Sequence, residues 1–246
     1  MGLSLTVLGC SGSYPGPGAA CSGYLVQGGG VNVVLDLGSG ALANLQHHLA
    51  LGAIDAVVLS HHHPDHWSDL IGLRTALKYG LGRTGLEVHG TARTRELAEA
   101  MTTGLAPTID WHDHVDGDEF TIGGLRLRVS RTDHYVETLA VRVDEPRSGR
   151  SLAYTADTGD GWSLASLGDG LDLALCESTY PTDEEVAGVL HLSAGQAGAM
   201  ARAARAARLV LTHLWPGTDP DDHQRRAQTT FGGPVHVART HERYDL

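Results

Sequence analysis

The sequence predicts an α/β fold of four layers, an αββα sandwich in which two β-sheets pack face to face and helices cover their outer faces. Two observations favour this fold. Short apolar stretches typical of strands alternate with helical stretches, and the strands gather in both halves of the chain. Two strand-rich halves bury their apolar faces when the sheets stack and the helices lie outside. A length of 246 residues suits a single domain spanning residues 1–246.

The apolar pattern places the elements in order. Strands are expected near residues 3–9, 22–28, 31–36, 56–59 and 86–90, then as several strands between about 119 and 156, and finally at 171–176, 208–212, 234–237 and 241–244. Helices are expected at about 40–51, 68–79, 92–104, 193–207 and 219–230. Ser68 and Ser193 are the expected N-caps, because a serine hydroxyl can accept a hydrogen bond from the first helical turn. Residues Pro146–Gly149 are expected to form a hairpin turn.

The most informative segment follows an apolar strand and reads His-x-His-x-Asp-His over residues 61–66. Imidazole is the commonest metal-binding side chain, and imidazole with carboxylate suits zinc or a related transition metal. His61 and His63 project to one side of an extended backbone, since side chains alternate with a period of two. Asp65 and His66 then come from the turn. This division into two pairs indicates two neighbouring metal ions rather than a histidine-rich surface turn.

Three further candidate ligands each follow a different expected strand. They are His134, Asp157 and His213. Together with segment 61–66, four separate strands would each deliver an ionisable side chain at the carboxyl end. Because chance does not readily explain this repetition, we expect these residues to meet at one rim of the fold.

The order of these residues resembles the metal signature of the metallo-β-lactamase superfamily over nearly the whole chain. The resemblance implies that superfamily's fold and two divalent ions, which we expect to be zinc, with manganese as the alternative. It implies that the first ion takes His61, His63 and His134, that the second takes Asp65, His66 and His213, and that Asp157 bridges them. True lactamases most often carry cysteine at the bridging position. The aspartate therefore resembles the hydrolase branches that include ribonuclease Z and glyoxalase II.

Three other stretches resemble the ribonuclease Z branch. They are the glycine-serine loop at 8–15, the acidic motif at 175–179 and the stretch at 191–198. In ribonuclease Z a histidine at the third place donates a proton near the leaving group, and His191 matches it in spacing and context. The resemblance thus implies that His191 is the general acid, with Glu177 as the candidate that orients it. A helix-flanking polar residue is the alternative interpretation of His191, and a plain tight turn that of the first loop.

One interval departs from tRNA-processing relatives. Only 23 residues separate His134 from Asp157, which leaves no room there for the long arm that clamps tRNA. The chain resembles instead compact, actinobacterial-type phosphodiesterases, some of which hydrolyse cyclic nucleotides. We therefore expect hydrolysis of a small phosphodiester, such as a cyclic mononucleotide, by hydroxide formed between two metals and aimed by Asp65. The alternatives are a ribonuclease acting on RNA 3′ ends, a thioester hydrolase of the glyoxalase II kind, and a metal-bearing sensor without turnover.

Composition narrows the partners. The net charge of −11 disfavours extended nucleic acid as a partner, because nucleic-acid binding relies on basic surface. No stretch of eighteen apolar residues predicts a membrane span, and the N-terminus reads as a first strand rather than a signal peptide. Cys10, Cys21 and Cys176 do not make a disulfide framework, so we expect a reduced, cytoplasmic protein. Its oligomeric state, including a homodimer, stays open.

The remaining histidines are expected to be non-catalytic. They are His47, His48, His89, His112, His114, His223, His236 and His241. Residues 111–114 are expected to form a solvated loop. Trp67 and Trp215, which flank the candidate ligands, are the candidate pocket residues, since an aromatic face there could stack on a base, and packing against a neighbouring helix is the alternative.

Overall fold

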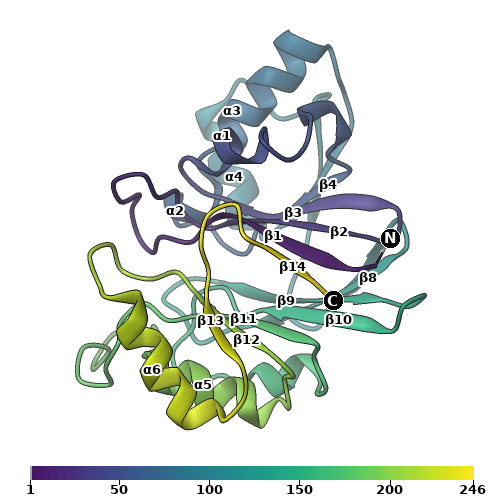
Figure 1. The fold of residues 1–246 in the computed structure, drawn as a ribbon. Helices are drawn as coiled ribbons and strands as arrows, with labels where there is room; N and C mark the ends of the chain where they lie inside the picture. The colour runs from purple at the N-terminus through teal and green to yellow at the C-terminus, as the bar shows by residue number, and fades with distance from the viewer. Residues whose placement is uncertain (1) are drawn as a thin grey trace.

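The fold is an αββα sandwich, which confirms the predicted layers. In the computed structural model, which describes residues 2–246, two seven-stranded sheets pack face to face. Figure 1 shows α1, α3 and α4 on the outer side of one sheet and α5 and α6 on the outer side of the other. None of the helices within residues 2–246 has the length and apolar character that a membrane crossing requires.

The first sheet has the strand order β14-β1-β2-β3-β4-β5-β6. Its strands are β1 (Ser4–Gly9), β2 (Gly23–Gly28), β3 (Val31–Leu37), β4 (Ala56–Val58), β5 (Leu86–Gly90), β6 (Ile109–Asp113) and β14 (Arg243–Asp245). Strands β3 to β6 run parallel, whereas β14, β1, β2 and β3 pair antiparallel. The helical segments of this half are α1 (Ala41–Leu45), η1 (Leu51–Ala53), α2 (Pro64–Trp67), α3 (Leu70–Thr75), η2 (Ala76–Leu81) and α4 (Ala92–Met101).

The second sheet has the order β13-β12-β11-β10-β9-β8-β7. Its strands are β7 (Glu119–Ile122), β8 (Leu125–Arg131), β9 (Leu139–Glu145), β10 (Arg150–Tyr154), β11 (Leu173–Glu177), β12 (Leu209–Thr212) and β13 (Val235–Val237). Strands β7 to β10 pair antiparallel and β10 to β13 run parallel, so each sheet has an antiparallel and a parallel half. The segments η3 (Leu164–Leu167), α5 (Ala194–Ala203) and α6 (Pro220–Phe231) complete this half.

The apolar core divides as the layers require. One buried cluster lies between the sheets, where Tyr24 of β2 and Tyr154 of β10 pack with ring centroids 5.0 Å apart. Each sheet has one further apolar cluster, which lies between the sheet and the helices that cover it. Burial of apolar area on both faces of a sheet is the main stabilising contribution in such a fold. Because apolar side chains fill both faces of each sheet, the polar candidate ligands lie in the segments at the ends of the strands.

Several predicted boundaries are confirmed. Ser193 caps α5, since its hydroxyl accepts a hydrogen bond from the Gln196 N–H and the Gln196 side chain bonds back to the Ser193 N–H. The turn at Pro146–Gly149 joins β9 to β10 as expected. The helix expected at 40–51 begins at Ala41 as expected but already ends at Leu45, so its expected end is wrong.

The helix expected at 68–79 is wrong in its start and its continuity. The helical turn α2 already begins at Pro64, because the proline ring fixes φ near the helical value and needs no N–H partner there. Ser68 adopts helical backbone angles at the C-terminal end of α2, so it is not an N-cap. The segment then continues as α3 and the π-helical η2.

The loop expected at 111–114 is also wrong in part. Trp111 and His112 belong to β6, which pairs in parallel with β5 through Val88↔Trp111 and His89↔His112. Strand β6 lies at the edge of its sheet, and most of its residues are at least partly exposed. Its polar sequence therefore carries no apolar alternation from which a strand could be predicted.

Candidate metal centre

The segment 61–66 passes from an extended stretch after β4 into the helical turn α2. His63 has extended backbone angles and precedes Pro64, the first residue of that turn. Asp65 and His66 therefore project from a helical turn, whereas His63 projects from the extended residue before it. His61, Asp65 and His66 are buried. The division into two pairs that the sequence predicts thus has a backbone cause.

Four side chains form a first group of candidate ligand atoms. His61, His63, His134 and Asp157 each present one such atom, and these atoms all lie within 4.8 Å of one another. The Nδ1 of His63 lies 3.0 Å from Nε2 of His61 and 3.2 Å from Nε2 of His134. Oδ2 of Asp157 lies 3.6 Å from Nε2 of His61. Three imidazoles and one carboxylate oxygen thus converge on one point.

A second group lies beside the first. Asp65, His66 and His213 again present atoms within 4.8 Å of one another. Nε2 of His213 lies 3.2 Å from Oδ2 of Asp65 and 3.3 Å from Nε2 of His66. The other oxygen of Asp157, Oδ1, lies 3.3 Å from Nε2 of both His66 and His213. Asp157 therefore faces the first group with Oδ2 and the second with Oδ1, which is the geometry of a bridging carboxylate.

The two groups fit two divalent cations. Within residues 2–246, Oδ1 of Asp157 is buried and has no hydrogen-bond partner, which is costly unless a cation meets it. Burial opposes ionisation of this carboxyl, yet His213 and His66 hold the pKa of Asp157 well below its usual value. Burial also lowers the pKa of His63 to about 4, so its imidazole is neutral, the form that binds metals. The buried His/Asp clusters are consistent with a dinuclear metal site, and nothing in them selects the metal.

Asp36, which the sequence analysis missed, supports the histidines on the first sheet. Its Oδ2 accepts hydrogen bonds from Nδ1 of His66 (2.7 Å), the Ser60 hydroxyl (2.8 Å) and the Tyr154 hydroxyl (2.8 Å). The Ser60 oxygen lies 3.0 Å from Nδ1 of His61, so Asp36 reaches His61 through Ser60. Each of these bonds leaves the Nε2 lone pair free for a metal. The only sequence signal is a carboxylate inside the apolar strand Val31–Leu37.

Glu177 plays the corresponding part on the second sheet. Its Oε2 accepts from the Thr179 hydroxyl (2.7 Å), and the Thr179 oxygen lies 3.0 Å from Nδ1 of His213. Its Oε1 accepts from the Thr158 N–H (3.0 Å) and from Nδ1 of His191 (2.9 Å). Glu177 is fully buried. A carboxylate, a hydroxyl and two imidazoles therefore repeat on both sheets, and His191 occupies the place that His66 has in the first set.

His191 stands at the edge of the two groups. Its ring stacks on that of His213 with centroids 5.5 Å apart and an interplanar angle of 15°. Burial opposes its protonation, but the charge of Glu177 and the hydrogen bond to it raise the pKa of His191 to about 9. A ligand atom of His191 also lies within 4.8 Å of Asp157 and His213. His191 can therefore hold a proton beside the two ligand groups, and its role as general acid stays a prediction.

The glycine-serine loop before β2 meets the second group. The Ser13 N–H donates a hydrogen bond of 2.8 Å to Oδ2 of Asp65. This loop N–H is therefore paired with a carboxylate of the protein itself, that of Asp65. A Cβ atom on Gly12 would lie 2.6 Å from the His213 carbonyl oxygen and 2.8 Å from its Nδ1. Glycine at this position lets the loop lie directly against His213.

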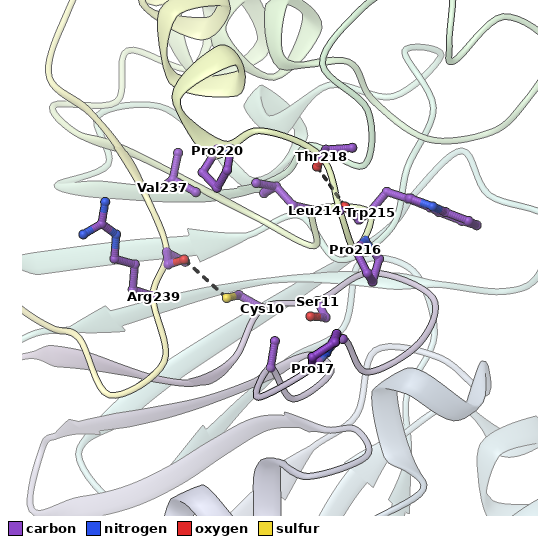
Figure 2. Close-up of a pocket in the computed structure, with 14 residues that line it drawn as sticks. Cys10, Ser11, Pro17, Leu214, Trp215, Pro216, Thr218, Pro220, Val237 and Arg239 are labelled. Atoms are coloured by element: carbon purple, nitrogen blue, oxygen red, sulfur yellow. Dashed lines mark hydrogen bonds between the residues drawn. The ribbon is translucent and has the colours of Figure 1, made fainter.

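The two tryptophans predicted to line a pocket differ. Trp67 is buried in the core beneath the first sheet's helices and donates to the His62 carbonyl, so the alternative, packing against a neighbouring helix, holds for Trp67. Trp215 and Pro216 do line a pocket of about 240 Å³. Figure 2 shows Leu214 pointing into this pocket while the Trp215 ring extends away from it. None of the seven candidate ligands is among the residues that line this pocket, so it is separate from the two ligand groups.

The eight histidines expected to be non-catalytic lie outside both groups. His223, a buried residue of α6, lies with its Nδ1 2.8 Å from the Ser178 hydroxyl oxygen. His48 and His241 meet on the surface, with Nε2 and Nδ1 2.9 Å apart. His89 and His114 stack with Phe120 at the sheet edges. The three cysteines are free thiols.

The chain is similar to known proteins over most of its length. The profile of a family described as the beta-lactamase superfamily domain matches residues 31–214. An uncharacterized protein of Mycobacterium leprae is 36% identical over 257 residues, which cover 99% of this chain and 89% of that protein. A ribonuclease Z of Methanopyrus kandleri is 27% identical over 93% of both chains.

The fold has a close counterpart among solved structures. The metallo-β-lactamase fold protein YhfI from Bacillus subtilis superposes with a TM-score of 0.90 at 28% identity, and the match covers 99% of both chains. That protein is described as a probable metallo-hydrolase. With the matched family, the shared fold and the two His/Asp groups, the chain belongs to the β-lactamase superfamily and has the metallo-β-lactamase fold with the site of a metal-dependent hydrolase.

Proposed function

We propose that this protein is a dinuclear metal-dependent phosphodiesterase that hydrolyses a small phosphodiester, such as a cyclic mononucleotide. The observation that carries the proposal is the His191–Glu177 pair beside the two ligand groups. Hydrolysis of a phosphodiester with a sugar leaving group expels a poorly stabilised alkoxide, which needs a proton donor. A thioester expels a thiolate, which needs none. The partly buried acid His191 therefore supports the phosphodiester over the glyoxalase II alternative.

The candidate ligands form two sets, each of which would hold one ion. His61, His63 and His134 would hold one ion, Asp65, His66 and His213 the other, and Asp157 both. Zinc suits this nitrogen and oxygen set, and manganese is the alternative. When bound, two such ions lower the pKa of water and neutralise charge on a phosphate. Asp65 then lies where it can accept a hydrogen bond from the attacking water, and His191 protonates the departing oxygen.

The loops around the site favour a substrate with one phosphate. Residues 10–19, 61–68, 133–138, 179–191 and 213–218 contain no lysine or arginine. The loop before α5 carries three acidic residues, Asp183, Glu184 and Glu185. These loops therefore supply no lysine or arginine to phosphates beyond the scissile one, whereas binding of extended nucleic acid depends on such contacts. The interval from His134 to Asp157 is occupied by β9, β10 and their turn.

A ribonuclease acting on RNA 3′ ends is the second candidate. The similarity to ribonuclease Z of Methanopyrus kandleri favours it. The metal-loaded protein should be assayed side by side on cyclic AMP, bis(p-nitrophenyl) phosphate, a precursor tRNA and a glutathione thioester. We expect turnover of the first two. Site-selective cleavage of the tRNA at physiological salt, without turnover of small diesters, would support the second candidate instead.

Replacement of His191 tests the proton donor directly. His191→Ala should lower kcat on cyclic AMP by about 10²–10⁴-fold, the usual contribution of general acid catalysis. Turnover of bis(p-nitrophenyl) phosphate should fall far less, because p-nitrophenolate leaves without a proton. The exposed His236→Ala variant is the control and should behave as the wild type. Equal losses on both substrates would show that His191 binds or positions substrate, and no loss would show that it only flanks a helix.

A further inference from the structure

We propose that Tyr14, Trp215 and Tyr180 form a stacking subsite for the planar base of the substrate. The inference rests on the proposed phosphodiesterase function and names the substrate class as a phosphodiester of an aromatic nucleoside. It concerns the part of the substrate that does not react. Binding energy from such a part holds the reacting phosphate in position.

The backbone ties each aromatic residue to the second ligand group. Tyr14 follows Ser13, whose N–H bonds to Asp65. Tyr180 follows Thr179, whose hydroxyl lies 3.0 Å from Nδ1 of His213. Trp215 lies two residues beyond His213, and its N–H donates a 2.9 Å hydrogen bond to the Thr179 carbonyl. Three separate loops thus bring an aromatic ring to the same side of the metal groups.

The three rings pack against one another in one cluster, and part of this cluster stays exposed to solvent. Tyr180 stacks on Trp215 with centroids 5.4 Å apart and an interplanar angle of 21°. Tyr14 meets Trp215 edge-on, at 5.5 Å and 82°. The Trp215 carbonyl is held by the hydroxyl and the N–H of Thr218. Tyr14 remains 46% exposed, so part of its ring stays open to solvent. A platform that is ordered before binding loses little entropy when a ligand stacks on it.

The chemistry of the rim selects an aromatic ligand. The rim loops carry no lysine or arginine but carry the three clustered aromatic rings, so they favour a non-reacting part that binds by stacking rather than by charge. Aromatic side chains stack on any base, because every base has a π-face. A subsite of this kind should therefore tolerate different bases. The pocket beside Leu214 is a different site, since neither Tyr14, Tyr180 nor any candidate ligand lines it.

Binding to the metal-loaded protein tests the subsite. The probes are AMP, ribose 5-phosphate, which lacks the base, and inorganic phosphate. Tyr14→Ala should weaken AMP binding by about 5- to 150-fold, the range for loss of one base–aromatic stack, and leave the other two probes unchanged. Tyr14→Phe should keep AMP binding. The control is Tyr79→Ala, since Tyr79 is 72% exposed on η2 and outside the cluster.

Each other outcome overturns the subsite. Equal weakening of all three probes would mean that Tyr14 only holds the Ser13 loop against Asp65. A wild-type protein that binds AMP no better than ribose 5-phosphate would mean that no base is recognised. Failure of the proposed function is a separate result, because it appears as absence of phosphodiester turnover in the wild type. AMP binding that depends on Tyr14 would persist in that case.

Discussion

At the scale of single residues, the site has two layers that matter equally. Asp36 and Glu177 each fix two imidazoles, one directly and one through a hydroxyl, Ser60 or Thr179. Such partners orient an imidazole and decide which nitrogen carries the proton. The repeat on both sheets means that the candidate metal ligands and the proposed acid are held by the same arrangement of a carboxylate and a hydroxyl. It also explains why His191 lies so close to the ligand His213.

Asp36→Asn tests this second layer. An amide can accept fewer hydrogen bonds than a carboxylate, so it cannot serve the Ser60, His66 and Tyr154 donors together. Metal affinity should fall by about 10- to 100-fold, measured by competition with a chelator. Asp55→Asn is the control, because Asp55 accepts from the Asn32 N–H away from the site. An unchanged affinity for Asp36→Asn would mean that the imidazoles are oriented by packing alone.

At the scale of elements, the loop that contains Gly12 packs directly against the candidate ligand His213 and so fixes its position. Gly12→Ala should displace His213, because the added Cβ meets its carbonyl oxygen at 2.6 Å. We expect selective loss of the second ion and a fall in kcat of about 100-fold, the usual cost of a small misplacement in an active site. Elemental analysis and turnover would measure both. Gly16→Ala is the matched control in the same loop, since its Cβ finds only an ordinary 3.4 Å contact with Pro216. A fully loaded and active Gly12→Ala protein would contradict the argument.

The edge strand β6 and its neighbour β5 carry an acid-sensitive stack. His89 is buried between His112, at 4.8 Å, and Phe120, at 4.6 Å, and its Nδ1 lies 2.9 Å from Nε2 of His114. Its Nε2 has no hydrogen-bond partner within residues 2–246, and the nearest carboxylate oxygen, on Glu87, is 3.7 Å away. Burial, with the charges of the two neighbouring histidines, lowers the pKa of His89 to about 3.

This stack should make stability fall in acid. The unfolded chain takes up the His89 proton near pH 6.5 and the folded chain only near pH 3, so stability is complete above pH 6.5 and declines below it. The slope is at most about 1.4 kcal/mol per pH unit, the limit for one proton. His89→Phe should remove this part of the decline, with His236→Phe as the control. Urea unfolding of the chelator-treated proteins at pH 7.5 and 5 measures it, and equal declines in wild type and His89→Phe would refute it.

At the scale of the whole molecule, the candidate metal centre joins the two sheets. Segment 61–66 belongs to the first sheet, whereas His134, Asp157 and His213 follow strands of the second. Bound ions should therefore stabilise the stacking of the sheets as well as the site. At a free metal concentration 100 times Kd, one ion contributes about 2.7 kcal/mol. Chelation should lower the melting temperature by roughly 2–4 °C per kcal/mol lost.

Asp157→Ala provides the comparison for that experiment. The variant lacks the carboxylate that faces both groups, so its melting temperature should respond weakly to metal or chelator. Asp160→Asn, an exposed change three residues later, should respond as the wild type does. A wild-type melting temperature that is indifferent to metal would mean that the sheets hold the seven residues in place without ions.

The sequence by itself determined the four layers and the candidate ligands. Apolar periodicity is a local property, and so is the placement of an ionisable residue directly after a strand. His61, His134 and His213 could therefore be predicted from their own neighbours, and the capping box at Ser193 likewise. The strand β6 and the start of α2 could not, because pairing with β5 and the proline at position 64 overrode the local pattern.

Only the tertiary structure decided what surrounds those ligands. Asp36 bonds to Tyr154 across 118 residues of sequence, and no local pattern links the two. Trp67 and Trp215 both flank candidate ligands in the sequence, yet packing buries the first and leaves the second at the rim. The orientation of an imidazole and the exposure of an aromatic ring depend on contacts between distant segments. The sequence specifies which side chains are available as ligands, whereas the packing of the two sheets determines their distances and orientations.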